Sequence, residues 1–136
     1  MWMTAIPRER KSGFVRCSCV TVIKQPLAGL LAVFGLRLEE QRMIQLDANS
    51  AKVVLATLLG RSFIGHGDCI PGARAQELAD AFVADVGGQS ATFYTNGDWQ
   101  EPMPRSWTPL TDAVFDGGVI AIGPTIAACV WIEEDD

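Results

Sequence analysis

The stretch VIAIGPTIAACVWI at positions 119–132 carries the clearest signal of the architecture. Two apolar runs, 119–122 and 126–132, lie on either side of Gly123-Pro124-Thr125, and this pattern predicts a β-hairpin with a tight turn. Neither run alternates between apolar and polar residues, so both faces of the hairpin must be covered by other parts of the molecule. The hairpin therefore constrains both the architecture and the assembly of the protein.

Two helices are predicted upstream of this hairpin. Asp47, Asn49 and Ser50 supply N-cap acceptors for a helix over 51–59, and Gly60 is a plausible end. Pro71 starts a second helix over 72–86, which Gly87-Gly88 ends. The apolar positions of this second helix follow the i, i+3, i+4, i+7 pattern: Ala75, Leu78, Ala79, Phe82 and Val86.

Short strands complete the predicted domain. They are expected over 43–46 and 91–94, and Asn96-Gly97 predicts a tight hairpin from which Trp99 begins the return strand. Three prolines predict an irregular segment over 100–110. Helices that precede antiparallel strands are typical of an α+β fold. We expect two helices packed on an antiparallel sheet of three to five strands, with the C-terminal hairpin central.

A further strand and a further helix are predicted within residues 1–42. A strand is expected over 14–23 and a helix over 27–40, with Pro26 near its first turn. Glu39-Glu40-Gln41-Arg42 before Met43 is encoded largely by purines, which resembles a ribosome-binding site. One hypothesis is that the natural product begins at Met43, so that 1–42 is an N-terminal extension of a single α+β domain over 43–136; the alternative is an ordinary acidic helix end. The intact mass of the protein expressed from its native gene distinguishes them.

The two apolar faces of the hairpin lead to an expectation about the oligomeric state. The two helices over 51–59 and 72–86 can cover one of its faces. Residues 1–42 or a second subunit must cover the other. We therefore expect a homo-oligomer, most strongly if the natural product begins at Met43.

Composition narrows the classes of function. The chain has 136 residues, a net charge of −5 and 49% hydrophobic residues, which fits one globular domain. Its acidity disfavours nucleic acid as a partner, and the basic cluster Arg8, Arg10 and Lys11 is interpreted as a solvated segment. No apolar stretch approaches the ~20 residues that span a bilayer. We expect a cytoplasmic protein without a membrane partner.

One loop carries a candidate catalytic pair. His66 and Asp68, flanked by glycines, can meet on one exposed loop, where an imidazole oriented by a carboxylate does general acid–base work. This pattern suits a small hydrolase-like enzyme. The alternative is that Asp68 caps the following helix and His66 has no chemical role.

The cysteines allow a weak metal alternative. Cys17, Cys19, His66 and Cys69 offer the ligand set of tetrahedral zinc, but the C-x-C spacing is unusual for such sites. No phosphate-binding loop or other cofactor motif is present. We expect no metal and no cofactor, and we interpret the four cysteines as reduced thiols.

Aromatic residues mark a candidate partner or ligand surface. Tyr94, Trp99 and Trp107 flank the proline-broken segment, and tryptophan is enriched at interfaces and in pockets. The alternative is that they cover the open edge of a small core. The acidic end, residues 133–136, either keeps a strand end soluble or recruits a basic partner.

Residues 43–136 resemble a loose group of small uncharacterised bacterial proteins of the kind carried on integron gene cassettes, and so on a mobile element. The matching segments are Gly60–Phe63, Gly65–Asp68, Thr111–Ile120 and Val130–Asp136. The resemblance carries no assigned activity.

The sequence predicts a non-enzymatic binding or interaction module that acts as a homo-oligomer, with a protein or a small molecule as its partner. Two alternatives stay open. One is the small enzyme using His66 and Asp68, and the other is an antitoxin or immunity-type protein that binds a basic partner.

Overall fold

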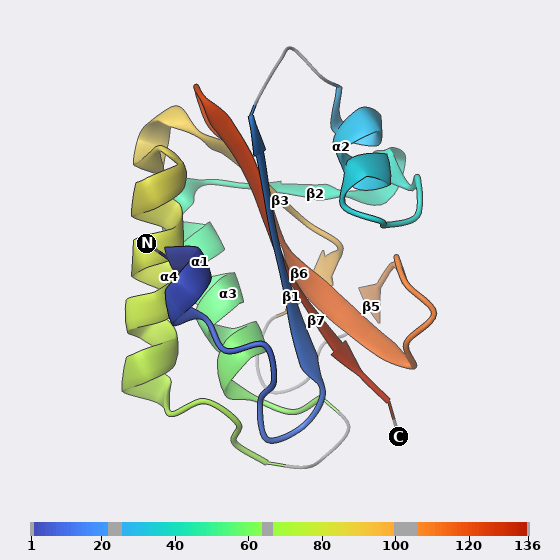
Figure 1. Cartoon of the computed structure of the whole chain (residues 1–136). Coiled ribbons are helices and arrows are strands. Elements are labelled where there is room, and N and C mark those ends of the chain that lie inside the picture. The colour runs from blue at the N-terminus through green and yellow to red at the C-terminus, as the bar shows by residue number, and fades with distance from the viewer. Residues whose placement is uncertain (1, 22–25, 64–66, 100–105, 136) are drawn as a thin grey trace.

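A five-stranded antiparallel sheet forms the centre of the molecule, in the order β1-β7-β6-β3-β2 (Figure 1). The computed structural model describes residues 2–21, 26–63, 67–99 and 106–135. The strands of the sheet are β1 (Phe14–Thr21), β2 (Ile44–Leu46), β3 (Thr92–Thr95), β6 (Phe115–Ile122) and β7 (Ile126–Glu134). The predicted α+β fold is confirmed.

Helices and short elements complete the described chain. The α-helices are α1 (Trp2–Ala5), α2 (Leu27–Val33), α3 (Ala48–Gly60) and α4 (Gly72–Val86). The 3-10 turns are η1 (Glu40–Arg42) and η2 (Gly88–Ser90), and a separate two-stranded ribbon consists of β4 (Gly97–Asp98) and β5 (Ser106–Trp107).

The C-terminal hairpin is central, as predicted. β6 pairs with β7 along its whole length, and the hairpin lies between β1 on one side and β3 on the other. At the turn, the Gly123 amide donates to the Ile126 carbonyl over 2.8 Å. The C-terminal hairpin therefore forms the middle of the sheet, and the other strands pair on either side of it.

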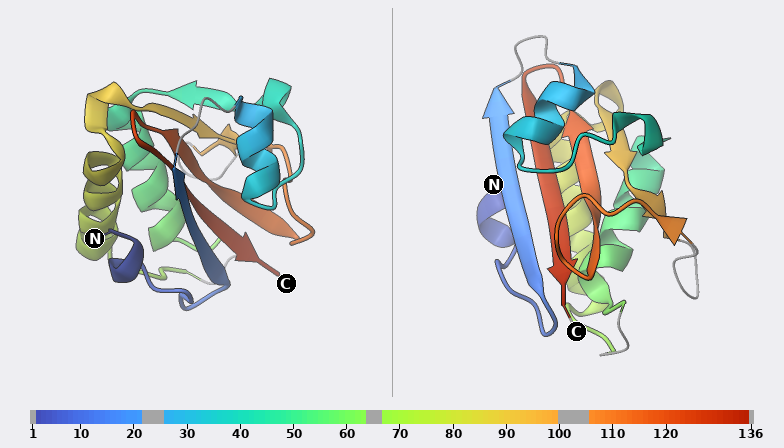
Figure 2. Two further views of the ribbon diagram at one scale, coloured as in Figure 1. Left: turned by 45° about the horizontal axis from the view of Figure 1, so that its top comes forward. Right: turned by 90° about the vertical axis from the view of Figure 1, so that its right-hand side faces the viewer.

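Both faces of the hairpin are covered, and this explains why its strands do not alternate between apolar and polar residues. Even-numbered positions of β7 face α3 and α4, and odd-numbered positions face α2 (Figure 2). We call the first set the main core; its β7 members are Ala128, Val130 and Ile132. The second core is made by Leu30, Leu31, Phe34, Leu36, Leu110, Ile120, Ala127, Cys129 and Trp131.

Two adjacent glycines in β6 leave room for two tryptophans. A Cβ on Gly117 would lie 2.5 Å from the Trp99 ring on the main-core face, and one on Gly118 would lie 2.5 Å from the Trp131 ring on the other face. Real Cβ atoms do not approach so closely. The pair Gly117-Gly118 therefore fixes where each indole lies on the sheet.

The two predicted central helices are confirmed. Asp47 is the N-cap of α3, and its carboxylate accepts from the Ser50 amide over 2.7 Å. That hydrogen bond lowers the pKa of Asp47 below its ordinary value. In α4, every apolar position that the pattern picked out is buried, and the helix ends at Gly87. Packing of these periodic faces against the sheet forms the main core.

The helix predicted over 27–40 is shorter than expected. α2 ends at Val33 because Gly35 adopts the left-handed conformation, with φ of +73°. The Leu36 amide then donates to the Leu31 carbonyl over 2.8 Å, which closes the helix end. Leu36 thereby turns back into the second core instead of continuing the helix.

The tight hairpin predicted at Asn96-Gly97 is wrong. β3 pairs with β2 and β6, whereas β4 after Asn96 pairs with β5. The Asn96 side chain is buried and donates to the Thr108 carbonyl and to Asp116, so it joins loops and does not shape a two-residue turn. Tertiary hydrogen bonds override the local turn preference here.

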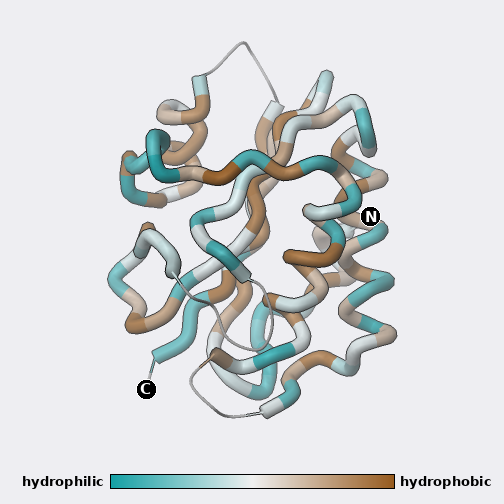
Figure 3. Tube along the Cα trace, turned by 180° about the vertical axis from the view of Figure 1, so that it is seen from behind, coloured by the Kyte–Doolittle hydropathy of each residue, from teal (hydrophilic) through white to brown (hydrophobic). Residues whose placement is uncertain are grey.

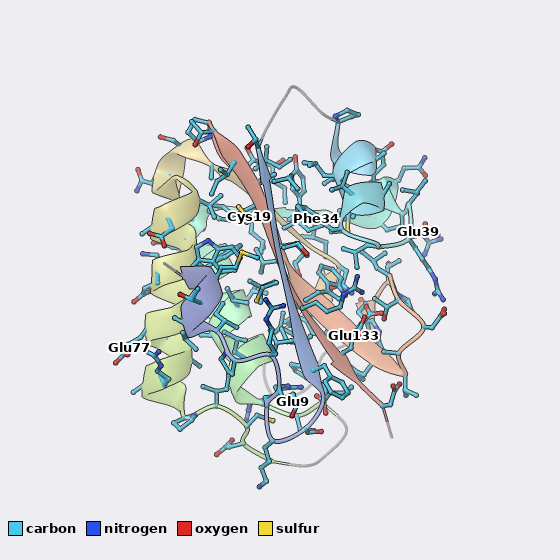
Figure 4. All side chains as sticks on the ribbon, in the orientation of Figure 1. Glu9, Cys19, Phe34, Glu39, Glu77 and Glu133 are labelled. Carbon is cyan, nitrogen blue, oxygen red and sulfur yellow. The ribbon has the colours of Figure 1, made fainter. Side chains whose placement is uncertain are left out.

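Residues 2–21 and 26–42 take part in the fold. α1 packs on α4, with the Trp2 and Phe82 rings edge to face at 4.8 Å, and β1 forms one edge of the sheet. α2 covers the second face of the hairpin, and Figure 4 shows Phe34 between this helix and the sheet. The face that the sequence left open to a second subunit is thus covered from within the chain.

The covering role of α2 can be tested at Leu31, which is fully buried in the second core. Leu31→Ala removes buried apolar contacts and leaves a cavity, so we expect the free energy of unfolding to fall by about 2–5 kcal/mol. Val33→Ala on the same helix is the control, because Val33 is 52% exposed. Urea denaturation measures both; equal effects would contradict this placement of α2.

Candidate functional site

An apolar groove of about 750 Å³ lies between α3, β2 and the β4 segment. Its apolar lining consists of Ile44, Leu46, Val53, Val54 and Trp99, and its polar lining of Asn49, Ser50, Thr57 and Asp98, with Gly97 between them. Figure 3 shows this side of the molecule from behind, where β2 crosses the view with alternating hydrophobic and hydrophilic residues. This groove is more apolar than the hollow lined by Arg16 and Arg37.

Two lining side chains of the groove are strongly exposed. Val53 on α3 is 63% exposed and Ile44 on β2 is 44% exposed. They come from separate elements but line the same groove. Large apolar side chains that converge on one hollow are typical of a binding site, whereas scattered ones need no explanation.

Trp99 is the buried aromatic residue of the groove. Its indole N–H donates to the Thr95 hydroxyl over 2.8 Å, and its ring lies against Gly117. The ring also packs at 5.4 Å from Phe63 and 6.4 Å from Trp107. These contacts hold Trp99 in one orientation, so it presents a fixed surface to the groove.

The polar lining comes from both ends of α3 and from β4. Asn49 and Ser50 follow the Asp47 cap, and the Ser50 amide is already satisfied by that cap. The Thr57 hydroxyl, near the other end of α3, donates to the Val53 carbonyl over 2.8 Å. The groove therefore combines an apolar lining with polar side chains from two elements.

The predicted aromatic surface is only partly assembled. Trp99 and Trp107 stack, and with Phe63 and Phe115 they form an aromatic cluster. Tyr94 lies elsewhere, because it faces Ile120 across the strand pair, on the side of the second core. The alternation of side chains along β3 separates Tyr94 from the tryptophans.

The candidate catalytic loop is held by backbone hydrogen bonds. Arg61 and Asp68 form an antiparallel bridge, and the Ser62 amide donates to the Gly67 carbonyl over 2.9 Å. Asp68 does not cap α4, because the N-cap of that helix is Pro71 without a side-chain bond. His66 lies outside the described residues.

The four cysteines are free thiols. Cys17 is buried in the main core and Cys129 in the second core, while Cys19 and Cys69 are half-buried. Burial raises the pKa of Cys17 to about 11 and also raises the pKa of Cys129 and Cys19. Among the residues that the structure describes, no group of three or more His, Cys, Asp or Glu side chains can hold a metal ion.

A buried carboxylate that sequence reasoning missed is Glu134. Its side chain is 1% exposed and pairs with Arg10, whose side chain is 0% exposed. Glu134 also accepts from the Ser12 and Ser62 hydroxyls over 2.8 and 2.7 Å and from the Phe63 amide over 2.8 Å. The period of β7 was the available signal, since Glu134 continues the inward positions of the strand.

This burial corrects the interpretation of the basic cluster as a solvated segment. Arg10 is not solvated, because its guanidinium donates to the Leu58 carbonyl over 3.0 Å and to the Arg61 carbonyl. At the acidic end, Glu133 pairs with Arg16 over 2.8 Å, and Asp135 accepts from the Val114 amide. Glu133, Glu134 and Asp135 therefore all have partners within the chain.

Asp116 is a second buried carboxylate, 1% exposed. It accepts from the Thr111 amide and hydroxyl over 2.8 and 2.7 Å, from the Leu110 amide and from Asn96. These donors hold the loop that precedes β6 and place Leu110 in the second core.

A second hollow, of about 590 Å³, is polar. Its charged lining is paired internally, with Arg16 bound to Glu133 and Arg37 bound to Asp112 over 2.6 Å. A ligand there would have to displace these pairs. The apolar groove is therefore the better candidate site.

Searches of family models, curated proteins and solved structures found no match to this chain. Across the described ranges, no helix is both long and apolar enough to cross a membrane.

The Arg10–Glu134 pair can be tested by removing one charge. Glu134→Gln leaves the Arg10 guanidinium buried without its counterion, so we expect the free energy of unfolding to fall by about 3–5 kcal/mol. Glu133→Gln is the matched control, because its pair with Arg16 is partly exposed and is worth about 0–1 kcal/mol. Guanidinium denaturation measures both variants, and similar losses would contradict the structural role of Glu134.

Proposed function

We propose that the protein is a non-enzymatic binding module whose groove between α3, β2 and β4 takes a small, mostly apolar ligand. The carrying observation is the groove itself, with exposed Val53 and Ile44 converging beside an immobilised Trp99. Its volume of about 750 Å³ lies in the range of known ligand pockets, roughly 300–1,000 Å³.

The energetics favour an apolar ligand. Burying a side chain of the size of valine or isoleucine contributes about 1.5–3 kcal/mol relative to leaving it exposed. A ligand that covers Val53 and Ile44 gains part of this free energy at each of the two side chains. Trp99 is already held by Thr95, so little conformational freedom is lost there on binding.

The polar side chains of the groove support a ligand that also carries a hydrogen-bonding group. Asn49 and Ser50 offer an amide and a hydroxyl, which both donate and accept hydrogen bonds, and Asp98 adds a carboxylate. A molecule with an apolar body and a hydrogen-bonding group matches this lining. The resemblance to integron cassette proteins does not indicate which ligand binds, so the proposal rests on the groove.

The two alternatives gain less support. The hydrolase rests on His66, which is not among the described residues, and on Asp68, whose described contact is a backbone bridge. An immunity-type protein would need free acidic charge for a basic partner, whereas Glu133 and Glu134 are paired within the chain. A cytoplasmic location is part of the proposal, because four free thiols suit a reducing compartment.

The groove can be tested with the uncharged fluorescent probe N-phenyl-1-naphthylamine. We expect saturable binding to the full chain, with quenching of tryptophan fluorescence as the probe covers Trp99. Val53→Glu places a charge on the wall of the groove, and we expect it to raise the Kd at least about tenfold, or about 1.4 kcal/mol.

Val114→Glu is the matched control for this experiment. Val114 is 60% exposed, close to the 63% of Val53, but it does not line the groove. We expect probe binding by Val114→Glu to equal that of the unmodified chain. The absence of saturable binding, or equal losses in both variants, would show that the groove is not a binding site.

A further inference from the structure

The outer edge of β1 has a defined pattern of backbone groups. The Val15 amide points away from β7, because it donates to the Arg8 carbonyl over 2.8 Å. In an antiparallel strand, the N–H and C=O groups of every second residue point to the same side. The amides and carbonyls of Cys17, Cys19 and Thr21 therefore also point outward from the sheet.

Residues 8–9 pair with the first part of this edge, and the described residues offer no backbone partner to the rest, residues 17–21, which we call the open segment. Glu9 bridges to Phe14, so residues 8–9 cover the edge as far as Val15. Beyond that point, the outward backbone groups of 17, 19 and 21 have no backbone partner within the described ranges. Figure 2 shows β1 along the margin of the sheet in its right-hand view.

The open segment is also free of charge. Residues 17–21 read Cys-Ser-Cys-Val-Thr, whereas proteins commonly place lysine or glutamate on an edge strand to prevent pairing. The chain as a whole carries a net charge of −5, so two copies repel each other over much of their surface. A neutral edge is where a second copy meets the least repulsion. The other edge strand, β2, has only three residues.

We propose that residues 17–21 of β1 form the interface of a homodimer, in which the same segment of a second copy pairs antiparallel with it about a two-fold axis through Cys19. The register sets Cys19 opposite the Cys19 of the second copy, and Cys17 opposite its Thr21. Each of these facing pairs exchanges two backbone hydrogen bonds. The two sheets then become one continuous antiparallel sheet, with an interface that is self-complementary, as two-fold symmetry requires.

This dimer differs from the one that the sequence alone suggested. The uncovered face of the hairpin was the reason to expect an oligomer, and α2 covers that face. The edge of β1 offers a different surface, made of backbone groups and not of apolar side chains. The groove lies at β2, on the opposite edge of the sheet, so this proposal does not depend on the proposed ligand.

The proposed register can be detected chemically, because it places the two Cys19 residues opposite each other. Residues that face each other in a hydrogen-bonded antiparallel pair have Cα atoms about 5.5 Å apart, which lies within the range that a disulfide bridges. Cys19 is half-buried, and Figure 4 labels it on β1. Oxidation with diamide at alkaline pH would join the two Cys19 thiols as a disulfide, with reduction of the diamide to its hydrazine.

The first experiment is sedimentation equilibrium of the full chain at micromolar concentration. We expect twice the chain mass. Thr21→Pro removes an outward N–H that β7 does not use, so the strand stays paired within the chain while the intermolecular ladder is blocked. We expect the dimer Kd to rise at least tenfold, with unchanged far-ultraviolet circular dichroism. Val53→Glu is the control on the opposite edge and should remain dimeric.

The second experiment keeps the fold unperturbed. Diamide should produce a covalent dimer of the unmodified chain and of Cys69→Ser, but not of Cys19→Ser. A monomer throughout the micromolar range would overturn the proposal, as would a dimer that survives Thr21→Pro. Cross-linking that persists in Cys19→Ser, or a dimer lost only in Val53→Glu, would also overturn it by placing the interface elsewhere.

Discussion

The buried ion pair between Arg10 and Glu134 holds together three segments of the fold. It joins the segment before β1, the end of α3 and the end of β7, which are far apart in the chain. Two charges removed from water are best tolerated when they are paired and accept or donate further hydrogen bonds. Here one terminal nitrogen of Arg10 donates to the Leu58 carbonyl, and Glu134 accepts from the Ser62 hydroxyl and the Phe63 amide. The pair therefore fixes the position of α3 relative to both strands.

Steric constraints at two glycines of β6 determine where two tryptophans lie, one of them beside the groove. Gly117 and Gly118 stand side by side in β6 and leave room for Trp99 and Trp131 on opposite faces. Trp131 completes the second core under α2, whereas Trp99 is pinned by Thr95 beside the groove. The Gly117-Gly118 pair thus affects both the packing of the sheet and the shape of the candidate site. The groove is rigid on this side because the aromatic cluster packs behind it.

The two edges of the sheet expose different groups. The proposed ligand groove lies at the β2 edge, and the proposed dimer interface lies at the β1 edge. At β2 the strand is short, and its side chains with those of α3 form an apolar hollow suited to a small molecule. At β1 the strand is long and uncharged over its open half, and it offers backbone groups suited to another strand. Because the proposed ligand site and the proposed dimer interface lie on opposite edges, occupation of one does not block the other. The arrangement follows from the strand order β1-β7-β6-β3-β2.

Elements whose signals are local could be predicted from the residues alone. The doubly apolar hairpin, the periodic face of α4 and the Asp47 cap were all predictable, because each depends on residues a few positions apart. Which elements contact each other depends on the folded chain. The hairpin predicted at Asn96-Gly97 does not form, because the Asn96 side chain donates to Asp116. Tyr94 lies apart from the tryptophans, because it faces Ile120 on the side of the second core. The partners of Arg10 and the lining of the groove come from distant segments, and no local pattern encodes such contacts.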